Sequence, residues 1–506
     1  RPEVYTWGIW RFNDMKDLEK WQIISFISRG TAMALGIIQS FFIVRLLSVS
    51  EWGIVQIAIS IGAALGIYQH LGLASASTRE ISAAKDNKEI FKIFVMSAFI
   101  RYLVSIPITV GLFLLAHRLA FNTYKVPEIE LPLKLYALVL LVQGFQSILN
   151  SIISGTKRFK RLFLYQAAIA VVGMALYIPL IYFYRVNGYF YALFAFNIIA
   201  SIVLAFLAFK PLGLSAFEWP NKKELKHLFK ELFTISMAIY VVKIIYTNWE
   251  KIGPNLLGLT ITPELVGYFG FALLYAKKLM NISDAVTDVS LPVFSDKYVN
   301  DRAGFEHTFS KNFNKLYILI IFIGSSAVYW AVEVIRLVVG GGKYDPSFPL
   351  ILPIVFAFIF YSFVNILKSS IIIPAKLVKE MVISFVALLG GTLAFYFSTY
   401  QVLGSLKAMS IGMVVGAFLS FVVLVVVSQL KFKYKFITHD HFLFMIMGLA
   451  VSYCWTLENI YIKVSAYAVF CLLFLWGSIV SKFIGMGDLA FLSKRFKHED
   501  IKQTDI

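Results

Sequence analysis

Three positively charged residues lie near the middle of long apolar segments: Arg29, Arg101 and Lys243. A charged side chain at the centre of a membrane-spanning helix costs roughly 2.5 to 3.5 kcal/mol on insertion scales. Because of this energetic cost, charged residues that face a cavity within the membrane usually have a function. The ammonium and guanidinium groups of Lys and Arg bind anions. The three cations therefore predict a membrane carrier for a substrate with an anionic group.

Polar residues accompany two of these cations at helical spacing, which places them on one face of each helix. Gln39 lies beside the stripe that contains Arg29, and Tyr240 and Glu250 continue the stripe of Lys243. The predicted cavity residues are Arg29, Lys243, Arg101, Glu250, Gln39 and Tyr240. The alternative is that these charges pair within the bundle, Lys243 with Glu250 for example, and only hold the helices together.

A histidine within an apolar segment, His70, adds a group that can exchange protons near neutral pH. It is a candidate proton relay, and the alternative is a hydrogen bond to a neighbouring helix.

The elements that carry these residues read as membrane-spanning helices. Hydrophobic residues make up 59% of the 506 residues and charged residues 15%, against about 25% charged in soluble domains. A span needs about 20 mainly apolar residues. Fourteen such segments are predicted, at 22–47, 53–76, 91–117, 132–154, 162–184, 189–209, 232–256, 265–283, 313–337, 349–371, 380–399, 406–429, 442–460 and 463–483.

The net charge of +18 is explained by the positions of the basic residues. With a cytoplasmic N-terminus, the inner segments hold 34 Lys and Arg and the outer loops hold 10. This excess follows the positive-inside rule, and an even number of spans places both termini in the cytoplasm. The basicity therefore requires no nucleic-acid partner.

The predicted organisation is two six-helix lobes with two additional C-terminal helices. The parts are an interfacial segment 1–21, an N-lobe 22–209, a cytoplasmic linker 210–231, a C-lobe 232–430, a basic loop with spans thirteen and fourteen 431–483, and a cytoplasmic tail 484–506. The turns at 46–53 and 256–267 each contain a Leu pair, a polar stretch, and Glu and Gly opening the next helix. This similarity predicts a parallel repeat with the substrate site between the lobes and transport by alternating access.

Other motifs predict structural roles. Glu333 and Arg336 are spaced to pair on one helix face. The sequence 439–441 offers His, Asp and His without further ligands nearby, which favours a solvated loop over a metal site. No catalytic residues and no cofactor are predicted. Uphill transport would use a proton or sodium gradient or the membrane potential.

Several motifs in the first lobe resemble the polysaccharide transporter (Wzx-type) oligosaccharide flippases of the multidrug/oligosaccharidyl-lipid/polysaccharide exporter superfamily. They are Ser28-Arg29-Gly30-Thr31, Arg45-Leu46-Leu47 with Glu51-Trp52-Gly53, Leu71-Gly72-Leu73-Ala74-Ser75-Ala76, Thr78-Arg79-Glu80-Ile81 and the turn 155–161. The outer turn 342–344, in the C-lobe, resembles the same family. The resemblance implies an all-α polytopic protein without enzymatic activity. It would translocate a polyprenyl-(pyro)phosphate-linked oligosaccharide from the cytoplasmic to the outer leaflet.

The resemblance also implies a cytoplasmic (inner) cell membrane location and partners among membrane lipids and glycan-assembly enzymes. By analogy with lipid II flippases, spans thirteen and fourteen would line a groove for the lipid tail. Two alternatives remain. The first is an ion-coupled multidrug antiporter of the same superfamily, which typically has acidic cavity residues. The second is a membrane glycosyltransferase, polymerase or ligase, which normally has a sizeable outer loop.

Overall fold

The computed structural model describes most of the chain. It covers residues 34–84, 86–156, 159–213, 217–221, 248–278, 301–375, 377–432 and 435–483, with scattered residues at 224–244 and 294–298. All regular elements in these ranges are helices. The chain forms two compact units, Arg1–Gly267 and Tyr268–Ile506. The predicted linker 210–231 lies before this boundary, and the division into six-helix lobes stays a prediction.

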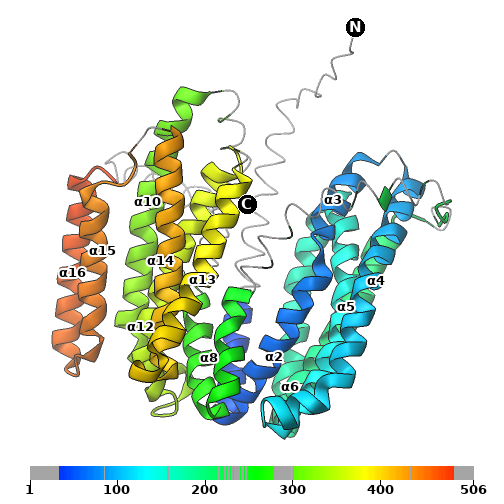
Figure 1. Ribbon diagram of the computed structural model, residues 1–506, viewed down its shortest axis with the longest axis horizontal. Helices are drawn as coiled ribbons and strands as arrows, with labels where there is room; N and C mark the ends of the chain where they lie inside the picture. Colours follow the sequence, from blue (N-terminus) through cyan, green and yellow to red (C-terminus); the bar gives the residue numbers. More distant parts are fainter. Residues whose placement is uncertain are drawn as a thin grey trace, which may run out of the picture. The chain divides into compact units, whose positions relative to one another are not determined.

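The first unit contains antiparallel helices joined by short turns (Figure 1). They are an apolar helix Ala34–Leu46, α2 (Val49–His70), α3 (Leu73–Ala83), α4 (Asn87–Arg118), α5 (Glu130–Gly155), α6 (Phe159–Phe209) and a helical stretch at 248–260, with η1 (Leu119–Thr123) and η2 (Pro127–Ile129) between α4 and α5. α8 (Pro263–Lys277) begins in this unit and continues into the second.

α2 starts and stops at local backbone signals. Ser48 caps its N-terminus in a capping box with Glu51, which satisfies two backbone N–H groups reciprocally. The helix ends because Leu71 and Gly72 both adopt positive φ angles of 45° and 67°. The prediction that span two continues to residue 76 is therefore wrong, and α3 is a separate helix.

α6 contains two predicted spans, which meet at a sharp turn at Arg185 (φ 52°). Gly188 permits this turn, because a Cβ at that position would lie 1.9 Å from the carbonyl oxygen of Leu180. The expected separation of spans five and six near residues 184–189 is confirmed.

The second unit is built around one strongly buried helix. Its helices are α10 (Arg302–Tyr329), α11 (Ala331–Val339), α12 (Phe348–Leu367), α13 (Val378–Leu403), α14 (Ser405–Phe432), α15 (His439–Tyr453) and α16 (Ile460–Val480), with the short helices η4 (Asp345–Ser347), η5 (Lys368–Ile372) and η6 (Cys454–Thr456). In the apolar stretch of α12, 83% is buried inside the structure, whereas only 22% is buried in the apolar stretch of α16. α12 is thus the core of this unit, and α16 is peripheral.

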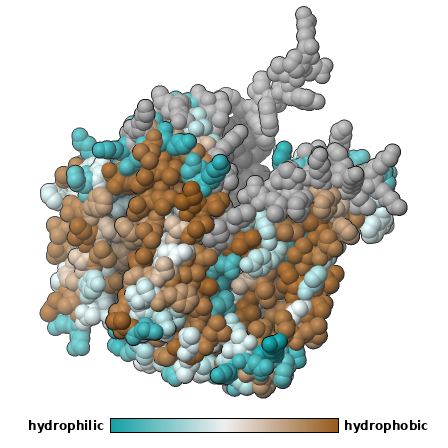
Figure 2. Space-filling model, in the orientation of Figure 1, coloured by the Kyte–Doolittle hydropathy of each residue, from teal (hydrophilic) through white to brown (hydrophobic). Residues whose placement is uncertain are grey.

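Within the described residues, nine helices are long and apolar enough to cross a membrane. Leu114 of α4, Leu472 of α16 and Val402 of α13 are among the exposed large apolar side chains. Apolar residues cover most of the described helices on the face shown in Figure 2. Such a surface matches a lipid environment. The chain is an all-α, multi-pass membrane protein.

The pairing expected between Glu333 and Arg336 is wrong. Span nine breaks at Trp330, and Arg336 of α11 binds Asp345 with 2.6 Å between Nη2 and Oδ2. Glu333 instead binds Lys463 of α16, with 2.7 Å between Oε1 and Nζ. Each charge therefore pairs with a residue from another element, and the two do not pair with each other along α11.

The expectation that residues 439–441 form a solvated loop is also wrong for His441. Its side chain is only 1% exposed at the start of α15, where Nε2 lies 3.1 Å from Oδ1 of Asn314 on α10. Its Nδ1 contacts the Thr438 hydroxyl and backbone at 3.0 and 3.1 Å. His441 therefore caps α15 and joins it to α10, and α15 and α16 lie at one edge of the second unit (Figure 1).

Candidate functional site

A buried polar cluster joins three helices of the first unit, and it contains one of the predicted cations. Arg101 of α4 is fully buried, as are Ser105 on the next helical turn and Gln69 near the end of α2. The Ser105 hydroxyl donates to Oε1 of Gln69 over 2.5 Å. Burying these groups within the membrane is costly unless they interact with one another or with a ligand.

Gly144 of α5 provides the space for this cluster. A Cβ at Gly144 would lie 3.3 Å from Nε of Arg101 and 3.8 Å from Oε1 of Gln69. Both side chains therefore pass directly over the glycine. The cluster presents a fixed cation in a low-dielectric environment, which is the arrangement that binds an anionic group strongly. In this structure the side chain of Arg101 is fully buried, with its Nε close to α5 at Gly144.

The chain segment after the predicted linker contacts the same helix, α2. Tyr240 is 8% exposed, and its hydroxyl donates to the carbonyl of Tyr68 over 2.9 Å. At the middle of α2, the Ser60 hydroxyl donates to Oδ1 of Asn255 over 2.8 Å. Residues of predicted span seven thus contact α2 at its middle and near its C-terminal end, where Tyr68 is one residue away from Gln69 of the buried cluster.

The other predicted site residues are placed as follows. Glu250 is buried and binds Lys251, with 2.8 Å between Oε1 and Nζ. Gln39 faces α6, since its Oε1 lies 3.3 Å from where a Cβ of Gly173 would be. His70 is the last residue of α2. The side chain of His70, together with Arg29 and Lys243, lies outside the described residues, so their roles stay predictions.

The two similar turns found in the sequence contact each other. A Cβ at Gly53 of α2 would lie 1.7 Å from the carbonyl oxygen of Pro263 at the start of α8. Reciprocally, a Cβ at Gly267 would lie 2.1 Å from the carbonyl oxygen of Val49. The two helix N-termini thus pack backbone to backbone in a symmetric way, which only glycine permits.

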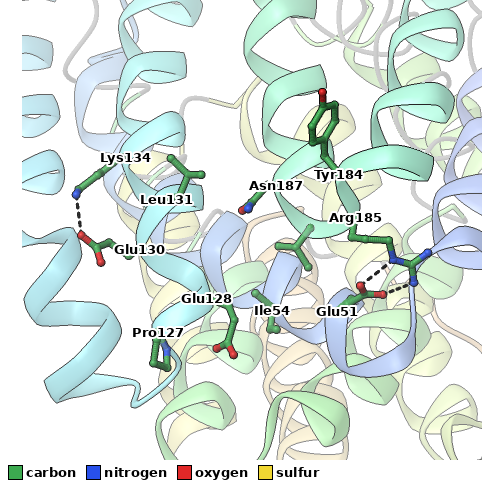
Figure 3. Close-up of a pocket in the computed structure, with 11 residues that line it drawn as sticks. Glu51, Ile54, Pro127, Glu128, Glu130, Leu131, Lys134, Tyr184, Arg185 and Asn187 are labelled. Carbon is green, nitrogen blue, oxygen red and sulfur yellow. Dashed lines mark hydrogen bonds and ion pairs between the residues drawn. The ribbon is translucent and has the colours of Figure 1, made fainter.

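At the same end of the first unit lies a cavity of about 580 Å³ between the starts of α2 and α5 and the turn of α6. Two ion pairs form opposite sides of it in Figure 3. Arg185 binds Glu51 through Nε–Oε1 (2.9 Å) and Nη2–Oε2 (2.5 Å), and Lys134 binds Glu130 at 2.7 Å. Glu128 and Asn187 lie between them (Figure 3).

At the opposite end, the segment after α6 is tied to the beginning of α4. Lys92 lies 2.9 Å from Glu218 and 2.8 Å from Glu224, and Lys88 also binds Glu218 at 2.9 Å. Hydrogen bonds from Lys92 and Lys88 lower the pKa of Glu218 to about 2, and Lys92 also lowers the pKa of Glu224. These contacts hold the predicted linker against the bundle.

The sequence did not reveal the partners in these clusters. Ser105, Asn255 and Arg185 look ordinary among apolar or loop residues, and their partners lie far away in the chain. A signal existed only for Gln69, because an amide beside His70 in an apolar segment requires a hydrogen-bonding partner.

Comparison with known proteins identifies the family. The profile of a family described as "Polysaccharide biosynthesis protein" matches residues 42–349, more than half of the chain. The chain belongs to this family. The resemblance to polysaccharide transporters is thereby confirmed, whereas a search of curated protein sequences finds no match.

Solved structures show the same fold at low identity. The lipid II flippase MurJ, in an inward closed conformation, has 14% identity and a TM-score of 0.69, with 90% of this chain and 98% of that chain covered. An inward-facing multidrug resistance MATE family transporter of the MOP superfamily has 15% identity and a TM-score of 0.63, covering 81% and 98%. A eukaryotic MATE transporter, AtDTX14, has 14% identity and a TM-score of 0.58, covering 86% and 99%. This protein has the all-α transporter fold of that superfamily.

Proposed function

We propose that this protein is a flippase for a polyprenyl-(pyro)phosphate-linked oligosaccharide. It moves this substrate from the cytoplasmic to the outer leaflet of the cell membrane by alternating access. The observation that carries the proposal is the match to a polysaccharide biosynthesis family by a chain with the fold of a lipid II flippase. A lipid-linked glycan is the substrate that would connect polysaccharide biosynthesis with the fold of a lipid flippase.

The buried cluster around Arg101 supports an anionic substrate. A guanidinium in a low-dielectric site attracts phosphate oxygens more strongly than the same group in water. Arg29 and Lys243 would add charge for a pyrophosphate. Replacing either with Gln should impair transport without abolishing membrane insertion, and unchanged transport in both variants would remove them from the substrate site.

Leaflet-resolved labelling of lipid-linked glycans, in cells with and without this protein, tests the proposal. We expect the glycans to accumulate on the cytoplasmic leaflet when the protein is lost and to return to the outer leaflet when it is re-expressed. Normal sidedness in the absence of any redundant carrier would contradict a flippase.

The fold similarity to MATE transporters favours an ion-coupled multidrug antiporter as the second candidate. Reconstituted protein would then move a cationic dye such as ethidium against an imposed proton or sodium gradient. A flippase would leave the dye gradient unchanged.

A further inference from the structure

The cavity at the turn of α6 has the size and position of a binding site. Its volume of about 580 Å³ is within the range of small-molecule pockets, about 300 to 1,000 Å³. It is formed by the starts of α2 and α5 and the turn of α6. The predicted topology places all three at the outer face.

Ion pairs hold the cavity walls in place. The guanidinium of Arg185 binds Glu51 through two nitrogens and also donates to the carbonyl of Leu46 over 2.7 Å. Lys134 fixes Glu130 one helical turn away on α5. The bidentate pair between Arg185 and Glu51 sets the orientation of both of these side chains. The lining is therefore organised before any ligand arrives.

Two polar side chains between these pairs are available to a ligand. Among the residues that the structure describes, no hydrogen bond or ion pair engages the Glu128 carboxylate or the Asn187 amide. Both line the cavity, Glu128 on η2 and Asn187 just after the turn of α6 (Figure 3). The carboxylate accepts hydrogen bonds, and the amide both donates and accepts them.

The charges decide the class of ligand. The lining contains three carboxylates, Glu51, Glu128 and Glu130, against two cations, Arg185 and Lys134. The excess negative charge repels phosphate and other anions. Neutral hydroxyl groups suit the cavity, because a hydroxyl can donate to the Glu128 carboxylate and a hydroxyl can accept from the Asn187 amide. The Tyr184 ring, 57% exposed, and the side chains of Ile54 and Leu131 add apolar surface.

We propose that this cavity is an outer subsite for neutral sugar residues of the transported glycan, with Glu128 and Asn187 as the hydroxyl-binding groups. Its role in transport rests on the proposed flippase function, but sugar binding itself is measurable separately. The subsite would receive the glycan as the phosphate group leaves the buried cluster around Arg101.

Saturation-transfer NMR on the purified full chain in lipid nanodiscs tests the subsite. The probe is the mixture of neutral oligosaccharides released by mild acid from the lipid-linked glycans of the source cells. We expect saturation transfer to the sugar protons with the unmodified protein. Glu128→Ala and Asn187→Ala should each weaken the apparent affinity about tenfold, because each removes a hydrogen bond to the ligand.

Glu264→Ala is the matched control, since Glu264 is an exposed carboxylate at the start of α8 and outside the cavity lining. Absence of transfer with the unmodified protein, or equal affinities in the Glu128 and Glu264 variants, would overturn the subsite. Flipping without sugar binding would refute the subsite and leave the proposed function standing. Sugar binding without flipping would leave the subsite standing and refute the proposed function.

Discussion

At the scale of single residues, Arg101 is the cation whose surroundings are best defined. Arg101→Gln removes the charge from the buried cluster, and we expect flipping in proteoliposomes to fall about tenfold or more. Arg101→Lys keeps the charge but loses the planar fork, so it should retain intermediate activity. Arg118→Gln, an exposed arginine at the end of the same helix, is the control and should flip normally. Unimpaired flipping by a folded Arg101→Gln protein would exclude this residue from the substrate path.

The sequence predicts which residues are unusual, but it does not predict their partners. Arg101 stands out because a charge interrupts an apolar segment. The hydrogen bond from Ser105 to Gln69 joins residues 36 apart in the sequence, so it depends on how α2 and α4 are rotated against each other. The same limit explains the error at Glu333 and Arg336, where helical spacing permits a pair but Lys463 and Asp345 come closer in the fold.

At the scale of elements, the segment after α6 is held against α4 by carboxylates with lowered pKa values. The pKa of Glu218 is about 2 in the folded protein, below its usual value of 4.5. Its ion pairs therefore stabilise the fold fully above pH 4.5, and this stabilisation is lost as the pH falls toward 2. We expect the protection of the backbone amides at residues 217–219 and 221, meaning their exchange rate relative to the intrinsic rate at the same pH, to fall between pH 4.5 and 2.5.

In Glu218→Gln this loss of protection should be smaller, and protection at neutral pH should already be lower. Glu264→Gln, which removes a carboxylate from the opposite end of the unit, is the control. An identical pH profile in the Glu218 variant and the original protein would show that these ion pairs do not hold the segment.

The attachment of α16 gives a second prediction at this scale. Lys463 is 1% exposed and binds both Glu333 and, at 3.0 Å, the carbonyl of Trp455. Lys463→Met leaves Glu333, whose side chain is 35% exposed, without its partner, so we expect a destabilisation of about 1 to 3 kcal/mol, measured as a lower thermal midpoint in detergent. Adding Glu333→Gln should recover part of this loss. Lys482→Met, a change just beyond the other end of α16, serves as the control, and an equal loss in both variants would contradict the role of the Lys463–Glu333 pair.

Helix positions could be predicted from the sequence because each span must match the bilayer thickness. Helix ends were harder, since they depend on local backbone conformation. The positive φ angles at Leu71 and Gly72 end α2 earlier than hydrophobicity alone indicates. The break at Trp330 likewise divides the predicted span nine into α10 and α11.

At the scale of the whole molecule, the two similar turns from which the sequence predicts a repeat meet at Gly53 and Gly267. In an alternating-access transporter built from parallel repeats, symmetry-related helices separate and rejoin during each cycle. A leucine at Gly53 would overlap the Pro263 carbonyl, and one at Gly267 would overlap the Val49 carbonyl. Either substitution should therefore prevent the helix N-termini from rejoining and lower the flipping rate in proteoliposomes.

Because the two glycines form one contact, their substitutions should not be additive. Gly53→Leu already holds the helices apart, so Gly267→Leu in the same chain should cause little further loss. Gly111→Leu is the matched control, as a Cβ at Gly111 of α4 meets no atom within 4 Å. If the two losses in flipping rate multiply in the double variant, the two positions act independently. Normal flipping by both single variants would mean that this contact has no role in the transport cycle. Equal and non-additive losses would instead make the joined turns the point at which the two repeats work as one transporter.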